Sequence, residues 1–551
     1  MTRLTLCIPL LCVGAVTLYA APQGEPETVI EPEAELGGTI ISAKTGEPLR
    51  RARVTLQPNW RGMRRENRKQ TTTGLNGQFL LRKLAAGQYT LQAEKTGYET
   101  RRGTRIGQFK LAQDESKTKL VIPLRPAAVI TGRILDSYGE PLAGARVGAL
   151  RRNFQPGSRA WDVVQITTTD DLGEYRLYGL SMGKYIVGIS PPQEPSQEGA
   201  FILEQLPAFY PGVLTPEEAA LLKVSWGTEL EAIDMKLAPA PATVVSGLLA
   251  DGDTGEALMG YLTIQTDGGA QLGNLQTTED GRFALYGLPS TDLAIWATSR
   301  RSRLMLMARG KVRPSESGVE ELQLIVRSGR PVSGKVVLED PPTQPEQSEA
   351  SQSQSEPRTS MLQLHPTTGR RFGRPHRARI PIEGGPFEIQ DVQPAEYRID
   401  VYAPPGAYLR AIGHSGKALE GFTLKVPHDS TITDLEVRFA FNGAAISGTV
   451  KEGAFGLEGF NADARIIIIP DEPEKSSART SSQVAEDGSF EITALPPGGY
   501  TLFTVENRST LDLWDPDVQR AFRASGEHVS LDAKGTATVD LTVIKEPEEP
   551  L

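Results

Sequence analysis

The chain reads as a succession of short apolar strands separated by polar turns. One segment, residues 52–56, alternates apolar and polar positions, which predicts a strand with one face in a core. Another, residues 465–469, has no alternation and predicts a strand buried on both faces. Five segments begin with a glycine followed by an aliphatic run, and we expect each to be a first strand: Gly38 to Ile41, Gly132 to Leu135, Gly247 to Leu249, Gly334 to Val337 and Gly448 to Val450.

A Gly-x-aromatic motif recurs at one point in each unit. Asp280-Gly281 and Asp487-Gly488, which open two of its copies, are dipeptides typical of tight turns. The strand that follows runs into a second turn, most often of the form L-x-x-G-x-Y, as in Leu84 to Tyr89. We expect the five aromatic residues to be buried: Phe79, Tyr175, Phe283, Phe387 and Phe490.

Successive units are spaced by roughly 90 to 115 residues, a length that can bury its own core. Short strands with frequent turns favour β-sandwiches, so the predicted fold class is all-β, a tandem array of about five small sandwich domains. The predicted organisation is a signal peptide 1–20, a linker 21–35, sandwiches at 36–126, 127–241, 242–329, 330–442 and 443–545, and a tail 546–551. Residues 341–360, rich in Gln, Ser, Pro and Glu, are expected to be a disordered insert in the fourth sandwich.

Two short accessory helices are also predicted. Thr215-Pro216-Glu217-Glu218 carries an N-cap, a proline at the first helical position and a capping-box glutamate, leading into residues 219–224. Asp515-Pro516 begins a similar segment that Gly526 is expected to end.

The order of these motifs resembles the carboxypeptidase regulatory-like domain, most strongly in the first two units and least in the fourth. The resemblance implies a transthyretin-like (prealbumin-like) sandwich, close to starch-binding-like and Cna-B-like modules, in a bacterial protein. Every residue of the motif is a turn or core residue, so the resemblance specifies the fold and leaves the function open. The peptidase that gives the family its name is not part of this chain.

Composition and charge narrow the function classes. The chain has 551 residues and a net charge of −9, whereas nucleic-acid binders are usually basic, so no nucleic acid is expected as a partner. Residues 1–20 are typical of a secretory signal, and no later apolar run is long enough to span a membrane. Both cysteines, Cys7 and Cys12, lie in that signal, so the exported product would lack disulfides and thiol chemistry. The expected location is the periplasm or the cell exterior.

No catalytic or metal-binding motif stands out, and no cofactor is expected. The five histidines form no H-E-x-x-H pattern, and His365 and His376 are interpreted as solvated loop residues around an arginine-rich loop. Asp251, Asp253 and Glu256 cluster as calcium ligands do, but a plain turn is the favoured interpretation.

The candidate binding residues lie in the variable loops of the first two units. Trp60 and Trp161 offer flat apolar faces for a sugar, with packing under the loop as the alternative. Arg61, Arg64, Arg65 and Arg68 form a basic cluster that could attract an anionic polymer. Two further basic clusters lie at residues 300–313 and 370–379, and solvated loops are the alternative for all three.

These features favour a non-enzymatic exported scaffold, adhesion or interaction protein arranged as a rod of five sandwiches. Its partner would be a glycan, an anionic cell-surface polymer or another exported protein. The alternatives are a carbohydrate-binding protein, which only the analogy of fold supports, and an accessory regulator of a separate peptidase or transporter.

Overall fold

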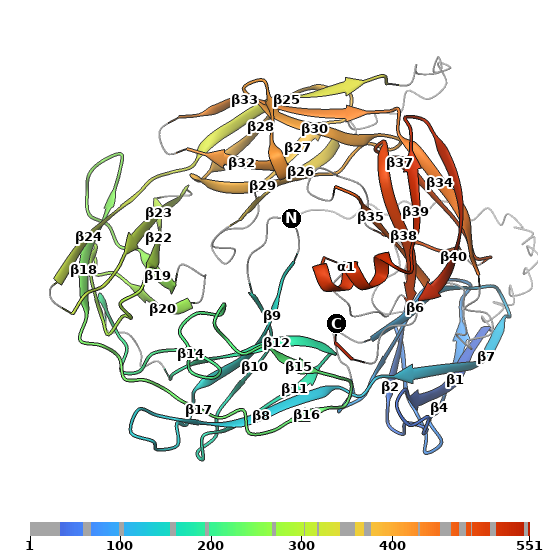
Figure 1. Cartoon of the computed structure of the whole chain (residues 1–551), viewed down its shortest axis with the longest axis horizontal. Coiled ribbons are helices and arrows are strands. Elements are labelled where there is room, and N and C mark those ends of the chain that lie inside the picture. Colours follow the sequence, from blue (N-terminus) through green and yellow to red (C-terminus); the bar gives the residue numbers. More distant parts are fainter. Residues whose placement is uncertain are drawn as a thin grey trace, which may run out of the picture.

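The computed structural model describes residues 34–58, 68–98, 104–154, 161–192, 198–266, 271–301, 304–316, 319–341, 359–367, 376–427, 430–451, 464–472, 481–485, 487–506, 514–544 and 549–550. The regular structure of the described residues is almost all β-strand, and their sheets form five successive sandwiches (Figure 1). The all-β fold class is therefore confirmed. The signal peptide, most of the linker and residues 342–358 of the expected insert lie outside the described residues.

The first three sandwiches contain most of the strands. The first has β1 (Ala34–Ser42), β2 (Arg53–Pro58), β3 (Lys69–Thr72), β4 (Gln78–Leu84), β5 (Gly87–Glu94), β6 (Thr104–Leu111) and β7 (Ser116–Leu124). The second has β8 (Ala128–Leu135), β9 (Arg146–Arg152), β10 (Trp161–Thr168), β11 (Glu174–Leu180), β12 (Gly183–Ser190), β14 (Ala208–Phe209), β15 (Leu222–Val224), β16 (Glu229–Leu230) and β17 (Met235–Lys236). The third has β13 (Ala200–Ile202), β18 (Val244–Asp251), β19 (Tyr261–Thr266), β20 (Gln271–Gln276), β21 (Arg282–Tyr286), β22 (Leu293–Arg301), β23 (Leu304–Val312) and β24 (Val319–Val326).

The last two sandwiches complete the array. The fourth has β25 (Arg330–Glu339), β26 (Thr359–Pro366), β27 (His376–Pro381), β28 (Gly385–Val392), β29 (Ala395–Val401), β30 (Tyr408–His414), β31 (Lys417–Ala418), the 3-10 turn η2 (Glu420–Phe422), β32 (Thr423–Val426) and β33 (Ile432–Ala440). The fifth has β34 (Ala444–Lys451), β35 (Ala464–Pro470), β36 (Ser481–Gln483), β37 (Ser489–Leu495), β38 (Gly498–Glu506), α1 (Pro516–Arg523), β39 (Glu527–Leu531) and β40 (Thr536–Ile544). Two strands begin inside segments expected to be irregular: β1 starts within the expected linker and β26 within the expected insert.

The two sequence motifs meet across one strand pair in every sandwich. The glycine of each first strand lies directly opposite the aromatic residue of the Gly-x-aromatic strand, as in Gly38 opposite Phe79 and Gly448 opposite Phe490. On its other side the same glycine contacts the chain that ends the unit. A Cβ atom on Gly38 would lie 2.2 Å from the carbonyl oxygen of Leu120, so no larger residue fits. The five aromatic residues are all buried, which confirms the core prediction.

The turn glycine and the second-turn tyrosine are explained by local contacts. Gly77 has a φ of +71°, a conformation that is costly for a residue with a side chain. A Cβ atom at this position would also lie 2.6 Å from the Ile40 carbonyl oxygen. In four sandwiches the tyrosine hydroxyl donates to the carbonyl oxygen four residues earlier, at distances of 2.6–2.9 Å; the donors are Tyr89, Tyr185, Tyr397 and Tyr500. The second turn is thus closed by a side chain that is itself in the core.

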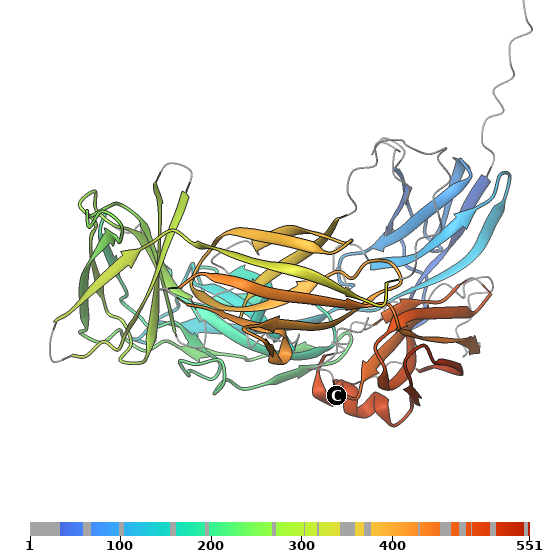
Figure 2. The same cartoon turned by 90° about the horizontal axis from the view of Figure 1, so that it is seen from above.

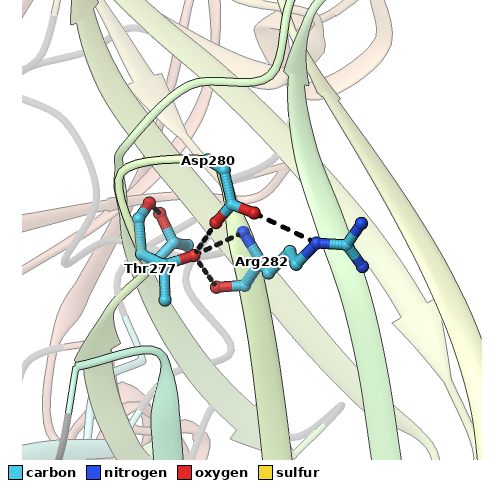
Figure 3. A network of polar contacts seen from close by, with 4 residues as sticks. Thr277, Asp280 and Arg282 are labelled. Atoms are coloured by element: carbon cyan, nitrogen blue, oxygen red, sulfur yellow. Dashed lines mark hydrogen bonds and ion pairs between the residues drawn. The ribbon is translucent and has the colours of Figure 1, made fainter.

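The polar turn before the aromatic strand is held by side-chain contacts. In the third sandwich the Thr278 hydroxyl accepts from the Arg282 backbone at 2.9 Å and lies 2.5 Å from the Asp280 carboxylate. The Arg282 guanidinium donates to that carboxylate at 3.1 Å, as Figure 3 shows. Because these groups are exposed and lie within five residues of each other, the role of the network is to stabilise the turn.

The fifth sandwich confirms one helix and the strand buried on both faces. Ile466 and Ile468 pack into the sandwich core, while Ile467 and Ile469 pack with Phe503 in a second cluster. Helix α1 covers that second face with its buried Val518 and Phe522. Asp515 caps the helix as predicted, because its side chain accepts from the Asp517 backbone at 2.9 Å.

The other predicted helix is wrong. The Thr215 hydroxyl contacts the Glu218 carboxylate at 2.9 Å, but the chain makes only a turn there. The residues that follow form β15, which pairs antiparallel with the edge of β12. Backbone hydrogen bonds to that edge replace those that a helix would have formed.

The chain between β12 and β16 also crosses the boundary expected at residue 241. Strand β13 pairs in parallel with β21 of the third sandwich. Phe201 and Leu203 belong to the third hydrophobic core, beside Val245 and Phe283. The third sandwich is therefore completed by β13 (Ala200–Ile202), which precedes its first strand β18 (Val244–Asp251) in the sequence and is separated from it by strands of the second sandwich.

The sandwiches follow an arc and do not extend as the expected rod. In both views the red fifth sandwich lies beside the blue first one (Figures 1 and 2). Helix α1 reaches the second sandwich, where the Lys184 ammonium lies 2.6 Å from the Asp517 carboxylate. We call this ion pair the closure contact.

Candidate functional site

A pocket of about 250 Å³ lies where the second and fifth sandwiches meet. It contains the closure contact, so its two walls come from residues that are far apart in the sequence. The second sandwich contributes the ends of β9, β10 and β12, and the fifth contributes the start of α1. The lining residues are Arg151, Arg152, Phe154, Trp161, Met182, Gly183, Lys184, Leu221, Asp515, Pro516, Asp517, Val518 and Pro550.

Strand register places the cations and the indole of the first wall. Arg152 ends β9, and Trp161, which begins β10, lies directly opposite it in the antiparallel pair. The Arg152 guanidinium lies over the Phe154 ring, 5.4 Å from the ring centroid. A Cβ atom on Gly183 would lie 3.4 Å from the Arg151 guanidinium carbon, so that side chain covers the start of β12.

The second wall is the N-terminal turn of α1. Its two carboxylates have partners: Asp515 accepts from the helix backbone, and Asp517 contacts both Lys184 and, at 3.2 Å, Arg520. The hydrogen bond and charge of Lys184 hold the pKa of Asp517 below its ordinary value. The Lys184 side chain is 20% exposed and that of Asp517 43% exposed, so water screens much of their attraction.

The predicted binding residues are only partly brought to this pocket. Trp161 lines it, although it begins a strand and does not lie in a loop. Arg68 is exposed just before β3 of the first sandwich and is not among the lining residues. Trp60, Arg61, Arg64 and Arg65 lie outside the described residues.

The acidic cluster of the third sandwich is a turn. The Asp251 carboxylate accepts from the Asp253 backbone at 2.8 Å, and Asp136 of the second sandwich does the same for three backbone groups at 2.8–2.9 Å. Because these oxygens complete the turn after each first strand, Asp251 needs no ion to explain it. Within the described residues, no three His, Cys, Asp or Glu side chains are grouped so as to hold a metal ion.

The histidines expected in a loop lie in strands. His365 is in β26, and its ring nitrogen lies 3.4 Å from the Asp400 carboxylate. His376 is in β27 opposite Leu364 and packs edge-on against the Tyr397 ring. Burial lowers the pKa of His376, with Asp391 opposing the shift. Since neighbouring positions along a strand face opposite sides, the two rings do not converge.

The remaining basic clusters are in part structural. In the cluster at residues 300–313, the Arg309 guanidinium lies over the Trp296 ring at 5.1 Å, and Arg313 pairs with Asp292 at 3.7 Å. Trp296 is buried, as expected for a core residue. In the cluster at 370–379, Arg377 and Arg379 are exposed on β27.

Sequence reasoning missed most of the pocket. Arg151 and Arg152 form an adjacent basic pair at the end of β9, a signal that could have been weighed with Trp161. Lys184 and Asp517 are 333 positions apart, and nothing local to either residue indicates that they meet.

Residues 35–118 match the family model of the carboxypeptidase regulatory-like domain. The match extends from β1 into β7, so it covers most of the first sandwich and confirms the resemblance in the unit where the motifs are strongest. The comparison with curated protein sequences gave no match.

Several solved structures are similar to stretches of the chain. The Bacillus anthracis TIE protein is 12% identical over 93% of this chain and 73% of its own, with a TM-score of 0.16. GBS52, the minor pilin of Streptococcus agalactiae, is 17% identical over 38% of this chain and 97% of its own, with a TM-score of 0.21. BcpA, the major pilin subunit of Bacillus cereus, is 11% identical over 53% and 99%, with a TM-score of 0.15. Scores this low carry no argument about this chain.

Proposed function

We propose that this protein is an exported, non-enzymatic scaffold that holds binding surfaces for other exported proteins in a fixed arrangement. One observation carries the proposal: the segments that join the sandwiches form hydrogen bonds or ring contacts with the sandwiches on both sides of them. A chain of independent modules would have solvated linkers there, and relative motion would be the default.

The first two junctions illustrate how the linkers are held. Between the first and second sandwiches, Ala127 donates to Gly97 on one side while Pro126 accepts from Gly227 on the other, both at 3.0 Å. The Arg125 guanidinium lies over the Trp226 ring at 5.1 Å. Between the second and third sandwiches, β13 adds a strand to the next sheet.

At the later junctions, individual linker residues form hydrogen bonds with the sandwiches on both sides. Arg327 exchanges backbone hydrogen bonds with Met307 of the third sandwich at 3.0 and 3.1 Å, and Gly329 donates to the Asp391 side chain of the fourth at 2.7 Å. Asn442 accepts from the Tyr408 hydroxyl of the fourth sandwich at 2.9 Å and from the Lys534 backbone of the fifth at 3.0 Å.

The described residues are compatible with a protein outside the membrane. Their one α-helix has eight residues, so none of their helices has the length or apolarity needed to cross a bilayer. Export itself rests on the sequence of residues 1–20. Mass spectrometry of the secreted product should find an N-terminus at Ala21; an intact residue 1 in the exported fraction would contradict cleavage.

The scaffold proposal is tested by loosening one junction in the full chain. A ten-residue Gly-Ser insertion at Ser328 should preserve each sandwich but change the pattern of cross-links that the protein forms to other exported proteins on intact cells. The control is the same insertion at Gly416, an exposed hairpin tip inside the fourth sandwich. Cross-links that are unchanged by the Ser328 insertion would mean that single sandwiches bind alone. Cross-links dominated by one peptidase or transporter would favour the accessory-regulator role.

Carbohydrate binding is a second candidate function, and one observation favours it. Trp161, chosen from the sequence as a sugar-contact residue, lines the pocket beside Arg152. An exported scaffold that also binds a cell-surface glycan would combine the two functions.

A further inference from the structure

The pocket between the second and fifth sandwiches has an excess of positive charge. Arg151, Arg152 and Lys184 line it, against the carboxylates of Asp515 and Asp517. Asp515 accepts from the helix backbone, and Asp517 is paired with Lys184 and Arg520. Both carboxylates are therefore engaged within the helix or in the closure contact. The positive charge of the opposite wall comes from Arg151 and Arg152.

Arg152 lines the pocket and carries the group best suited to bind a planar anion. Its guanidinium lies over the Phe154 ring, which fixes the side chain at a low cost in conformational freedom. The N–H donors of a guanidinium lie in its plane and match the two oxygens of a carboxylate. An anion in the pocket can thus be bound without displacing the ring contact.

Trp161 supplies an apolar face next to this cation. It is half-buried at the start of β10, opposite Arg152 in register, and the pocket lining also includes the apolar side chains of Met182 and Leu221. An indole presents a flat surface on which a sugar ring can pack, while its N–H remains available to a hydroxyl. A guanidinium and an indole on one wall suit a ligand with both a ring and a carboxylate.

The size of the pocket limits the ligand to about one ring. A volume of about 250 Å³ is just below the roughly 300–1,000 Å³ that small-molecule sites usually offer. A flat groove for an extended polymer would be larger and would be lined along one sandwich.

We propose that this pocket binds a carboxylate-bearing sugar ring, either a free uronic acid or the terminal residue of an acidic glycan. The inference deepens the second candidate function and leaves the scaffold proposal independent of it. The carboxylate binds to Arg152, and the ring packs on Trp161. Because residues of both sandwiches line the pocket, the ligand also favours the arrangement in which the second and fifth sandwiches are in contact.

Titration calorimetry of the full chain tests the ligand class. Galacturonic acid should bind and galactose, its neutral counterpart, should bind at least about tenfold more weakly, since one charge-assisted pair distinguishes them. Trigalacturonic acid distinguishes the two sources: binding at least as tight as that of the monosaccharide indicates a glycan terminus, and much weaker binding indicates a free uronic acid. Equal affinity for galactose and galacturonic acid, or no binding of either at millimolar concentration, would overturn the proposal.

Variants separate the two contributions. Trp161→Ala should weaken galacturonic acid binding at least about fivefold at every salt concentration, as removal of other stacking contacts does. Arg152→Gln should weaken binding most at low salt and flatten its salt dependence. Arg146→Gln is the matched control, because Arg146 is exposed on the same strand and is not among the lining residues. Thermal unfolding of each variant checks that the sandwich is intact.

An acidic peptide is the competing ligand. Triglutamate that binds as tightly as galacturonic acid, with no loss in Trp161→Ala, would replace the sugar by a peptide and overturn the proposal. Cross-linking to exported proteins is measured on the same Trp161→Ala variant. Unchanged cross-links together with lost sugar binding would show that the pocket and the scaffold function are separate.

Discussion

The first and second sandwiches share one motif and differ in what the chain does after the fifth strand. In the first, β6 and β7 follow directly and complete the two sheets. In the second, the chain leaves after β12, gives β13 to the third sandwich, returns as β14 and β15, and ends with the short β16 and β17 in place of one long strand.

The comparison shows that some residues determine the sandwich itself and others determine how the sandwiches are joined. The glycine, aromatic and tyrosine positions build the same sandwich in both cases, because each has a fixed partner in the strand ladder. The excursion of the second sandwich decides how the sandwiches are joined. It places Phe201 in the core of the third sandwich and Leu221 in the pocket at the fifth.

The largest expected effect tests the core of the third sandwich, which β13 completes. Phe201→Ala should destabilise the third sandwich by about 3–5 kcal/mol, because it removes a buried aromatic ring from a core that the second sandwich does not share. Hydrogen exchange of the β18 and β21 amides measures the loss. Ile202→Ala is the control, since that side chain is 60% exposed on the other face of the same strand. Faster exchange confined to β8 and β9 would show that Phe201 belongs to the second sandwich.

The close approach of the first-strand glycine should matter more in the first sandwich than in the second. A Cβ atom would lie 2.2 Å from the Leu120 carbonyl for Gly38 and 2.1 Å from the Ile233 carbonyl for Gly132. Leu120 is inside strand β7, whereas Ile233 lies between the short strands β16 and β17, where its backbone is held only by hydrogen bonds to the Thr131 carbonyl and from the Tyr175 hydroxyl. Gly38→Ala should therefore cost about 3 kcal/mol and Gly132→Ala about 1 kcal/mol. Denaturant unfolding measures both, and equal costs would remove this distinction between the two sandwiches.

The sequence predicted what depends on local pattern. The five first strands, the buried aromatics, the doubly buried strand 465–469 and the helix after Asp515 all follow from periodicity or turn chemistry. The helix expected at 215–224 does not form because residues 222–224 pair with the edge of β12. Helix-capping rules consider only neighbouring residues and therefore could not predict this pairing. Strand β13 has three residues, too few for a period to show, and the pocket joins residues whose separation leaves no local signal.

The tyrosine of the second turn should make the same contribution in both sandwiches. Tyr89→Phe and Tyr185→Phe each remove a 2.8 Å hydrogen bond to a backbone carbonyl and leave the ring in place. We expect each to cost about 1 kcal/mol in thermal unfolding of its own sandwich. Tyr138→Phe is the control, because that ring is 89% exposed. Clearly different costs for Tyr89→Phe and Tyr185→Phe would mean that the chain between β12 and β16 also affects the motif that the two sandwiches share.

The closure contact should affect the arrangement of the sandwiches and leave their stability unchanged. Asp517→Asn removes the charge that faces Lys184, and both groups are partly exposed, so neither sandwich should unfold earlier. Small-angle scattering should instead show a larger radius of gyration as the fifth sandwich moves away from the second. Arg520→Gln is the matched control, because it removes the partner of Asp517 that lies within α1 itself.

Acidification should reproduce the effect of Asp517→Asn, and the sign follows from the pKa. Lys184 lowers the pKa of Asp517 in the closed arrangement, so the contact contributes fully above the ordinary aspartate pKa and is lost as the pH falls through the depressed value. Asp515 and Arg520 are the other charged groups next to Asp517. The native chain should therefore open at acid pH while Asp517→Asn is already open at neutral pH and changes little. If the native chain keeps its radius of gyration through that range, contacts other than this ion pair close the arc.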